Sequence, residues 1–289
     1  METMYLRYFT QDTNYPFNIQ YGFHEEDLYM HTHADFSELV IVLNGTAMHR
    51  VDKEAYFIKK GDVFVISNNT SHGYENAYDF RICNIMYRPD QLQSSDLDIR
   101  KLAGFHALFV IEPYFTMERS FQSRLKLPLD DFEEVHRIIA RMIQEYEQKK
   151  YGWKTFLNSQ FMMLVVLLSR AYSLTSFDVK EDVINIAKSL SYIERHYKED
   201  ITIERLAEKS NLSVRHFTRI FHLTYQTTPG NYILTLRMQH ACLLLKESNL
   251  TISEVAYQSG FNDSNYFTRQ FRKLFSLTPS QYRNQVAGG

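Results

Sequence analysis

The spacing of apolar residues changes along this chain and divides it into a β-rich part and a helical part. Over about the first 90 residues, apolar residues form short runs between Gly and Asn turns, which is typical of β-strands. From about residue 130 onward they recur every three or four positions, which predicts amphipathic helices. With 289 residues the chain is long enough for two domains. We therefore expect a two-domain α+β protein with an all-helical C-terminal domain.

The β-rich part contains five predicted strands, in residues 38–43, 47–51, 55–58, 63–66 and 80–87. Asn44-Gly45, between the first two, is a hairpin signal. Closely spaced strands with such turns predict a small barrel or jelly roll, which we place in residues 1–125. The mouth of such a barrel is a natural ligand pocket.

The C-terminal part contains one pattern twice. Phe-Thr-Arg-Ile-Phe at 217–221 returns as Phe-Thr-Arg-Gln-Phe at 267–271, and Thr-Pro-x-x-Tyr follows each copy. A short helix with a small residue, Ala207 or Ala256, precedes each copy. The repeat predicts two helix-turn-helix modules, in residues 201–222 and 251–272, here called the first and second module. Thr202 and Thr251 are the expected N-caps of the leading helices, and Ser213 and Ser264 those of the second helices.

The second helix of each module has an apolar face and a polar face. The residues expected in the two cores are Val214, Phe217, Ile220 and Phe221, then Phe267, Phe271 and Leu274. The polar faces carry Arg215, Thr218 and Arg219 in the first module and Asn265, Thr268 and Arg269 in the second. Arg, Asn and Thr are side chains that bind base edges in the major groove of DNA. A solvated helix face is the alternative, and the repetition of the arrangement favours DNA binding.

A single helix, predicted from Tyr232 to Glu247, joins the two modules. Its sixteen residues span about 24 Å, which could place the two second helices about 34 Å apart, one turn of DNA. One chain could then contact two successive major grooves.

Two more helices are predicted in residues 126–175, one with apolar residues from Phe132 to Tyr146 and one from Trp153 to about Tyr172. Packing on the barrel of one chain is one reading of their apolar surface. We favour the other, in which part of this surface pairs two copies into a homodimer, because a dimer binds repeated half-sites more tightly. Residues 176–183 are the predicted linker to a domain at 184–289.

Charge and cysteine content agree with this division. From residue 201 to the end there are ten Lys or Arg and five Asp or Glu, a net charge of +5, which leaves −7 for residues 1–200. A basic C-terminal part suits a domain that binds the phosphates of DNA.

Cys83 and Cys242 fall in different predicted domains, so we expect no disulfide framework. With no leader and no apolar run near 20 residues, we expect a soluble cytoplasmic protein with no membrane contact.

Residues 252–271 read Ile-Ser-Glu-Val-Ala-Tyr-Gln-Ser-Gly-Phe-Asn-Asp-Ser-Asn-Tyr-Phe-Thr-Arg-Gln-Phe, and Thr-Pro-Ser-Gln-Tyr-Arg follows at 278–283. With residues 201–221, this long pattern resembles the DNA-binding domain of the AraC/XylS family of transcription regulators. The resemblance implies promoter DNA as partner and no enzymatic activity. It implies base contacts by Arg215, Thr218 and Arg219 in the first module, and by Ser264, Asn265 and Arg269 in the second.

A second constellation lies in the β-rich part: His31, His33, Glu38 and Gly45, then Gly61, His72 and Asn76. Alternation places His31 and His33 on one face of an extended segment, as chelation requires. The spacing resembles the two motifs of cupins, in which three His and a Glu converge inside a barrel and can hold a metal. The second motif departs from that pattern, because Ser67 stands where Pro is usual and Asn69 where Gly is usual.

Four uses of His31, His33, Glu38 and His72 remain open. They are the catalytic metal centre of a cupin enzyme with an accessory DNA-binding domain, a non-catalytic metal site, an effector pocket and an internal hydrogen-bond network. We favour a pocket for a small, hydroxyl-rich effector. No cofactor is then required, although three imidazoles and a carboxylate could bind a divalent metal such as zinc, nickel or iron. A barrel that only dimerises is a further alternative.

Two further segments narrow the resemblance. Residues 33–46, His-Ala-Asp-Phe-Ser-Glu-Leu-Val-Ile-Val-Leu-Asn-Gly-Thr, and 83–88, Cys-Asn-Ile-Met-Tyr-Arg, resemble the L-rhamnose-responsive regulators within the AraC family. This implies an activator whose effector is L-rhamnose or a related sugar. In rhamnose-type activators, acidic residues beside the second module contact the sigma subunit of RNA polymerase. Glu254 and Asp263 occupy the matching positions, and simple solvation is the alternative for both.

Overall fold

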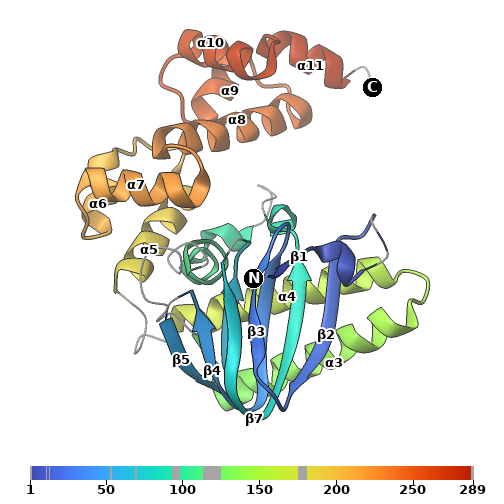
Figure 1. The fold of residues 1–289 in the computed structure, drawn as a ribbon. Helices are drawn as coiled ribbons and strands as arrows, with labels where there is room; N and C mark the ends of the chain where they lie inside the picture. The colour runs from blue at the N-terminus through green and yellow to red at the C-terminus, as the bar shows by residue number, and fades with distance from the viewer. Residues whose placement is uncertain are drawn as a thin grey trace. The chain divides into compact units, whose positions relative to one another are not determined.

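The computed structural model describes residues 2–10, 12, 14–52, 54–68, 70–92, 98–112, 125–174 and 181–287. It divides into two compact units, Met1–Ala187, here called the sheet unit, and Lys188–Gly289, the helical unit (Figure 1). The sheet unit contains a β-sheet with helices, and the described part of the helical unit contains helices alone. The predicted two-domain α+β architecture is therefore confirmed.

Eight strands form one sheet in the order β1-β3-β7-β4-β6-β8, with β2 paired to β7 and β5 to β4. Their bounds are β1 Glu2–Met4, β2 Phe17–His24, β3 Leu28–His33, β4 Ser37–Val51, β5 Glu54–Lys59, β6 Asp62–Ile66, β7 His72–Tyr87 and β8 Leu125–Lys126. The long strands β4 and β7 are antiparallel from Ser37↔Tyr87 to Val51↔His72. Each of them therefore has two further partners, one along each half, and buried residues of β4, β5, β6 and β7 share one core.

The predicted hairpin at Asn44-Gly45 is wrong, because β4 continues through it. The pairing of β4 with β7 shifts register on both sides of Asn44, which identifies a β-bulge. Gly45 has φ +73°, and a Cβ there would lie 2.1 Å from the carbonyl oxygen of Asp79. The Asn44 side chain donates a 2.6 Å hydrogen bond to the Asp79 carboxylate. Turn-forming residues thus allow a close approach of two strands here, and the chain reverses only after Val51.

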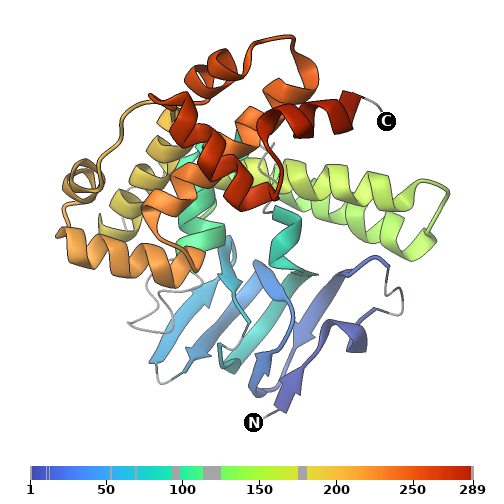
Figure 2. The same ribbon diagram turned by 90° about the horizontal axis from the view of Figure 1, so that it is seen from above.

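Two antiparallel helices, α3 (Leu129–Gln148) and α4 (Trp153–Leu174), pack on the sheet (Figure 2). Phe161 of α4 contacts Phe17 and Tyr87, with ring centroids 5.4 and 5.2 Å apart. The apolar residues predicted for the first helix are buried from Phe132 to Ile143. Shorter elements are η1 Leu6–Tyr8, η2 Pro89–Leu92, η3 Asp98–Lys101, α1 Ala103–Phe105 and the π-helical turn η4 His106–Ile111. No helix in the described ranges has both the length and the apolar character needed to cross a bilayer.

The helical unit begins within α5 (Glu181–His196) and continues with α6 Ile203–Lys209, α7 Val214–Tyr225, α8 Pro229–Glu247, α9 Ile252–Gln258, α10 Ser264–Phe275 and α11 Pro279–Ala287. Because α5 starts at Glu181, the predicted linker of 176–183 extends too far into the helix. Residues 175–180 lie outside the described residues.

Three of the four predicted N-caps are confirmed. The side chains of Thr202, Ser213 and Thr251 each accept a hydrogen bond from the backbone N–H three residues later. Ser264 is not a cap, since it is the first residue of α10 and the preceding Asp263 caps that helix. A carboxylate at this position accepts hydrogen bonds from the free backbone N–H groups of the first turn. It also interacts favourably with the positive end of the helix dipole.

The predicted cores of the two modules are largely confirmed. Phe217, Ile220 and Phe221 are buried in the first module, and Phe267 and Phe271 in the second. The prediction is wrong for Val214 and Leu274. These side chains are 40% and 50% exposed and lie near the ends of their helices. Helix α8 serves both cores, because Tyr232 contacts Phe221 with ring centroids 5.5 Å apart and Met238, Ala241 and Leu245 join the core around Phe267 and Phe271.

Candidate functional site

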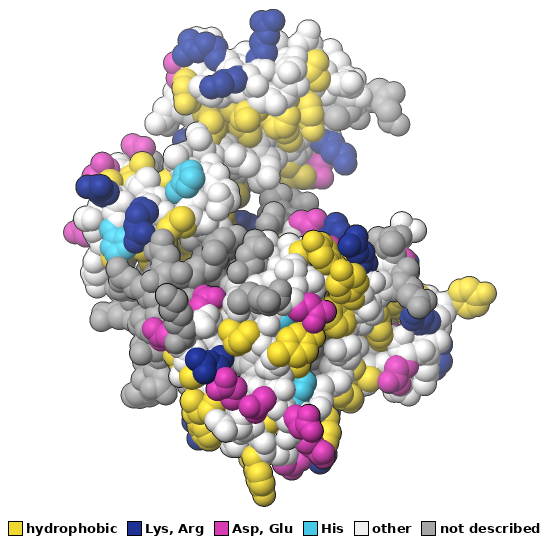
Figure 3. Space-filling model, in the orientation of Figure 1, with side chains coloured by type: hydrophobic (Ala, Val, Ile, Leu, Met, Phe, Trp, Pro, Cys, Tyr) yellow, Lys and Arg dark blue, Asp and Glu magenta, His cyan; other side chains and the backbone are white. Residues whose placement is uncertain are grey.

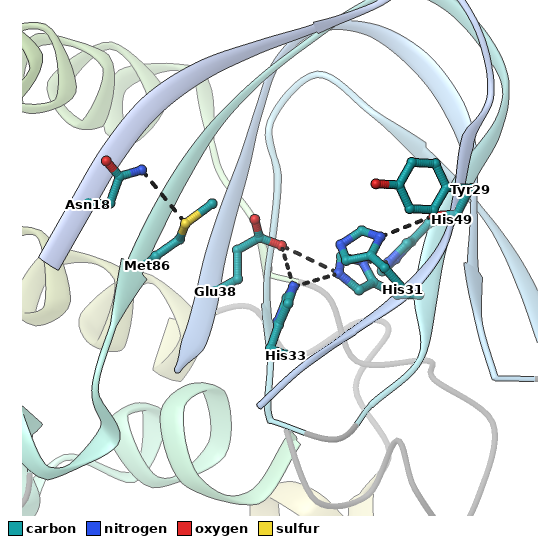
Figure 4. Close-up of polar contacts among 8 residues, drawn as sticks. Asn18, Tyr29, His31, His33, Glu38, His49 and Met86 are labelled. Carbon is teal, nitrogen blue, oxygen red and sulfur yellow. Dashed lines mark hydrogen bonds and ion pairs between the residues drawn. The ribbon is translucent and has the colours of Figure 1, made fainter. Parts of the chain in front are cut away.

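The four polar residues predicted to converge in the barrel lie together in the structure. His31 and His33 come from β3, Glu38 from β4 and His72 from the start of β7. The pairing of His31 with His72 across β3 and β7 brings the two rings to 4.3 Å between centroids. All four residues are buried. Figure 4 shows the side chains of His31, His33 and Glu38 pointing toward a common point.

Distances within this histidine cluster (His31, His33, Glu38 and His72) are short. His72 Nε2 lies 3.2 Å from His33 Nε2 and 3.5 Å from Glu38 Oε2. His33 Nε2 lies 3.8 Å from the same carboxylate oxygen. The three histidines offer ligand atoms that all lie within 4.8 Å of one another. The cluster is thus a compact group of nitrogen and oxygen donors.

Neighbouring groups orient two of these imidazoles. His31 Nδ1 donates to the carbonyl oxygen of Tyr29 at 3.1 Å, because that oxygen can only accept. His72 Nδ1 lies 3.4 Å from Nε2 of His49, a residue that the motif spacing missed. Alternation along 47–51 could have found it, since His49 shares the buried face of β4 with Ala47 and Val51.

Two other residues of the motif pattern make contacts outside the cluster. Ser67 is buried and its hydroxyl lies 3.0 Å from that of Thr70. Asn76 has φ +52° and donates its backbone N–H to Asp27. Asn69 lies outside the described residues.

Burial determines the charge state of the cluster. It raises the pKa of the Glu38 carboxyl to about 8 and, together with the neighbouring His31, lowers the pKa of His33 to about 3. The pKa of His72 lies well below its usual value for the same reasons. Near neutral pH the carboxyl is therefore largely protonated and the imidazoles are neutral. Neutral imidazoles keep a lone pair that can bind a metal or accept a hydrogen bond.

Unsatisfied polar atoms accompany the cluster. Within the described part of the chain, Nδ1 of His33 and the hydroxyl of Tyr74 are buried without a hydrogen-bond partner. The Tyr74 ring lies 6.0 Å from that of His72. Such atoms usually mark the place of a water, an ion or a ligand.

A separate groove of about 570 Å³ lies on the sheet unit away from the cluster. Its walls are Tyr21, Gly22, Phe23, Leu43, Asn44, Arg81, Ile82 and His136. The Arg81 guanidinium lies 5.4 Å from the Phe23 ring centroid and pairs with Asp79. Sequence reasoning did not single out this groove, because its residues come from β2, β4, β7 and α3.

The predicted DNA-contacting residues lie on α7 and α10. Arg215, Arg219, Asn265 and Arg269 are exposed, whereas Thr218 and Ser264 are half-buried. Arg215 and Asn265 belong to the first turns of their helices, the part that contacts base edges in helix-turn-helix proteins. Figure 3 shows Lys and Arg side chains on the surface of the helical unit.

Glu254 and Asp263 both bind helix N-termini. Glu254 accepts hydrogen bonds from the backbone N–H and hydroxyl of Thr251 at 2.7 and 2.8 Å, which completes a capping box on α9. Asp263 accepts from the N–H groups of Asn265 and Tyr266 at 2.7 and 3.1 Å. These backbone hydrogen bonds lower the pKa of both carboxyls. Each acid therefore stabilises the fold, whatever else it contacts.

Known protein families match each of the two units separately. Residues 19–165 match the AraC-like ligand binding domain, and residues 206–285 match a helix-turn-helix domain. This chain is an AraC-family transcription regulator. AraC-family proteins are regulators, so the alternative of a cupin enzyme is wrong and the prediction of a non-enzyme is confirmed.

This AraC-family regulator is 28% identical over 252 residues to the HTH-type transcriptional activator RhaS of Escherichia coli O1:K1 / APEC, covering 87% of this chain and 86% of the other. The C-terminal domain of the response regulator yesN from Fusobacterium nucleatum is 36% identical, with a TM-score of 0.32, over 33% of this chain and 93% of that one. An apo form of ToxT from Vibrio cholerae is 14% identical, with a TM-score of 0.36, over 93% of this chain and 97% of that one.

Proposed function

We propose that this regulator activates transcription from a promoter when its sheet unit binds a small sugar, L-rhamnose or a related compound. The observation that carries the proposal is the match of the sheet unit to the AraC-like ligand binding domain and of the helical unit to a helix-turn-helix domain. Ligand control requires that the effector bind more tightly to the DNA-competent arrangement than to the other. The two unpaired thiols, Cys83 and Cys242, suit the reducing cytoplasm in which we place it.

For DNA, we propose base contacts by Arg215, Thr218 and Arg219 of α7, and by Ser264, Asn265 and Arg269 of α10. Exposure of the arginines and of Asn265 supports this assignment, as does the placement of both helices as second helices of their modules. Arg binds guanine and Asn binds adenine through two hydrogen bonds. The single helix α8 between the modules favours two contacts on one side of a duplex.

For the effector, we propose a site inside the sheet unit beside the histidine cluster. The unsatisfied Tyr74 hydroxyl and His33 Nδ1 support it, since sugar hydroxyls both donate and accept hydrogen bonds. The choice of a sugar rests on the resemblance of residues 33–46 and 83–88 to L-rhamnose-responsive regulators and on the 28% identity to RhaS.

For assembly, we propose a homodimer formed through the helical pair of residues 126–175, leaving 1–125 for the effector and 184–289 for DNA. Phe156 and Met163 are exposed on α4, which supports a further contact on that helix.

Glu254 and Asp263 are the proposed contacts to RNA polymerase. Both side chains are exposed while they cap α9 and α10.

The test is binding to labelled DNA from upstream of the protein's own and neighbouring genes, at fixed salt, with and without L-rhamnose and related sugars. We expect site-specific binding that one sugar strengthens. Tyr74→Phe should abolish the sugar effect while leaving sugar-free DNA binding unchanged, and Arg81→Ala in the outer groove is the matched control. Specific binding that responds to none of the sugars would refute the sugar and keep the regulator. A sugar response lost in Arg81→Ala alone would move the effector to the groove.

A further inference from the structure

Two strands hold three imidazoles at fixed positions in the histidine cluster. His31 is opposite His72 in the backbone pairing of β3 and β7, and His33 lies two residues further along the same buried face of β3. Glu38, the second residue of β4, adds a carboxyl group from a third strand, which would release its proton on binding a cation. The spacing of the donors is thus set by the sheet rather than by flexible loops.

The distances between donors fit the edges of a coordination polyhedron. Metal–ligand bonds of 2.0–2.1 Å in tetrahedral geometry separate neighbouring ligand atoms by about 3.3 Å. His33 Nε2 and His72 Nε2 are 3.2 Å apart, and Glu38 Oε2 lies 3.8 and 3.5 Å from them. A distance of 3.8 Å is too long for a hydrogen bond. It is close to what two ligands of one ion require.

A hydrogen-bond network satisfies this arrangement less completely. His72 Nε2 has either one hydrogen or one lone pair, yet it faces both His33 Nε2 and Glu38 Oε2. A cation between the three atoms would interact with all of them at once. The Nδ1 contacts of His31 to Tyr29 and of His72 to His49 leave the Nε2 atoms of both rings for such an ion, as outer partners of metal-bound histidines commonly do.

We infer that His31, His33, His72 and Glu38 bind one divalent transition-metal ion inside the sheet unit. Three imidazoles and one carboxylate suit Zn²⁺, Ni²⁺ or Fe²⁺ rather than Ca²⁺ or Mg²⁺, which prefer oxygen ligands. The ion would join β3, β4 and β7 and stabilise the sheet unit. This inference does not rest on the proposed effector, and its test uses neither sugar nor DNA.

The experiment starts from the full-length chain, freed of any histidine tag, stripped with EDTA and dialysed. Titration with Co²⁺ should give visible d–d absorption that saturates at one ion per chain, and elemental analysis after Zn²⁺ loading should give the same stoichiometry. His72→Gln should weaken binding about tenfold or more. His136→Gln, at an exposed position on α3, is the matched control and should bind like the unchanged chain.

Circular dichroism must show that each variant is folded. A folded, unchanged chain that binds well under one equivalent and gives no saturable d–d band would overturn the inference. Equal binding by His72→Gln and the unchanged chain would also overturn it, because the ion would then bind elsewhere. Should His72→Gln fail to fold, His31→Gln takes its place in the same comparison.

Discussion

Arg237 of α8 donates a 2.6 Å hydrogen bond from Nε to the carbonyl oxygen of Tyr197, just after the end of α5. Its Nη2 donates to the carbonyl oxygen of Glu199 at 2.7 Å. The intervening Lys198 lies against Gly260, where a Cβ would be 2.7 Å from Lys198 Cα. The segment leading into the first module is therefore held between α8 and the turn of the second module. These contacts fix how the two modules are placed relative to each other.

Gly260→Ala should destabilise the helical unit by about 1–3 kcal/mol. Gly260 has φ +90°, which is costly for any other residue, and the new methyl group would meet the backbone of Lys198. Urea unfolding followed by circular dichroism measures the change. Gly230→Ala is the control, because a Cβ there has nothing within 4 Å, and it should be neutral or slightly stabilising. Equal effects of the two changes would contradict the contact described here.

Arg215→Ala and Arg269→Ala should each weaken binding to the cognate site by about 1–3 kcal/mol and relax the preference at one base pair. Both side chains are exposed on the helices proposed to enter the major groove. Binding to a library of sites at constant salt gives affinity and base preference together. Arg141→Ala, on α3 of the sheet unit, should change neither. Equal weakening on every sequence would show instead that these arginines contact phosphates.

Asp263→Ser and Asp263→Ala should separate the capping of α10 from a polymerase contact. Ser is a good N-cap and keeps the helix start, whereas Ala loses the cap at a cost of about 0.5–2 kcal/mol. We expect the Ser variant to keep most of the stability and the DNA binding of the unchanged chain and to lose activation in a reporter assay. Full activation by the Ser variant would remove Asp263 from the proposed contact with polymerase.

His106→Gln should reduce the loss of stability in acid. Burial, with the Arg100 charge nearby, lowers the pKa of His106 to about 3 in the folded chain. Below pH 6.5, the ordinary pKa of histidine, His106 is protonated in the unfolded chain but stays neutral in the folded chain. The free energy of unfolding therefore falls as the pH drops from about 6.5 toward 3. Gln can still donate to the carbonyl oxygen of Arg100, which His106 Nε2 contacts at 2.5 Å.

Unfolding free energies at pH 7.0 and 5.0 measure the effect. Other buried histidines, including His33, keep part of the acid sensitivity in this variant. The unchanged chain, measured at the same two pH values, is the reference. The same fall in the variant and in the unchanged chain would mean that His106 is not a source of acid instability.

Local signals in the sequence predicted most of the helical unit. Caps such as Thr202 and Thr251 act within three residues, and the repeat around Phe217 and Phe267 specifies the same packing twice. Alternation predicted that His31 and His33 share one face, and the resemblance to the cupin motifs implied that Glu38 and His72 converge with them, as all four buried side chains do.

Long-range pairing explains what was missed. Asn44-Gly45 has the chemistry of a hairpin, but β7 pairs along the whole of β4 and turns the signal into a bulge. His49 meets His72 only because the same pairing brings the ends of β4 and β7 together. Val214 and Leu274 have the right spacing for a core, yet they lie where the helix ends leave the packed interior.

Helix α8 gives the helical unit a property that neither module has alone. Its first turns bury Tyr232, Ile233 and Leu236, and its later turns bury Met238, Ala241 and Leu245. Melting of one module would strip apolar contacts from the helix that supports the other, so the two should unfold as one cooperative segment in native-state hydrogen exchange. A fragment cut after α8 would expose the Met238 side of the helix to water and would be prone to aggregate.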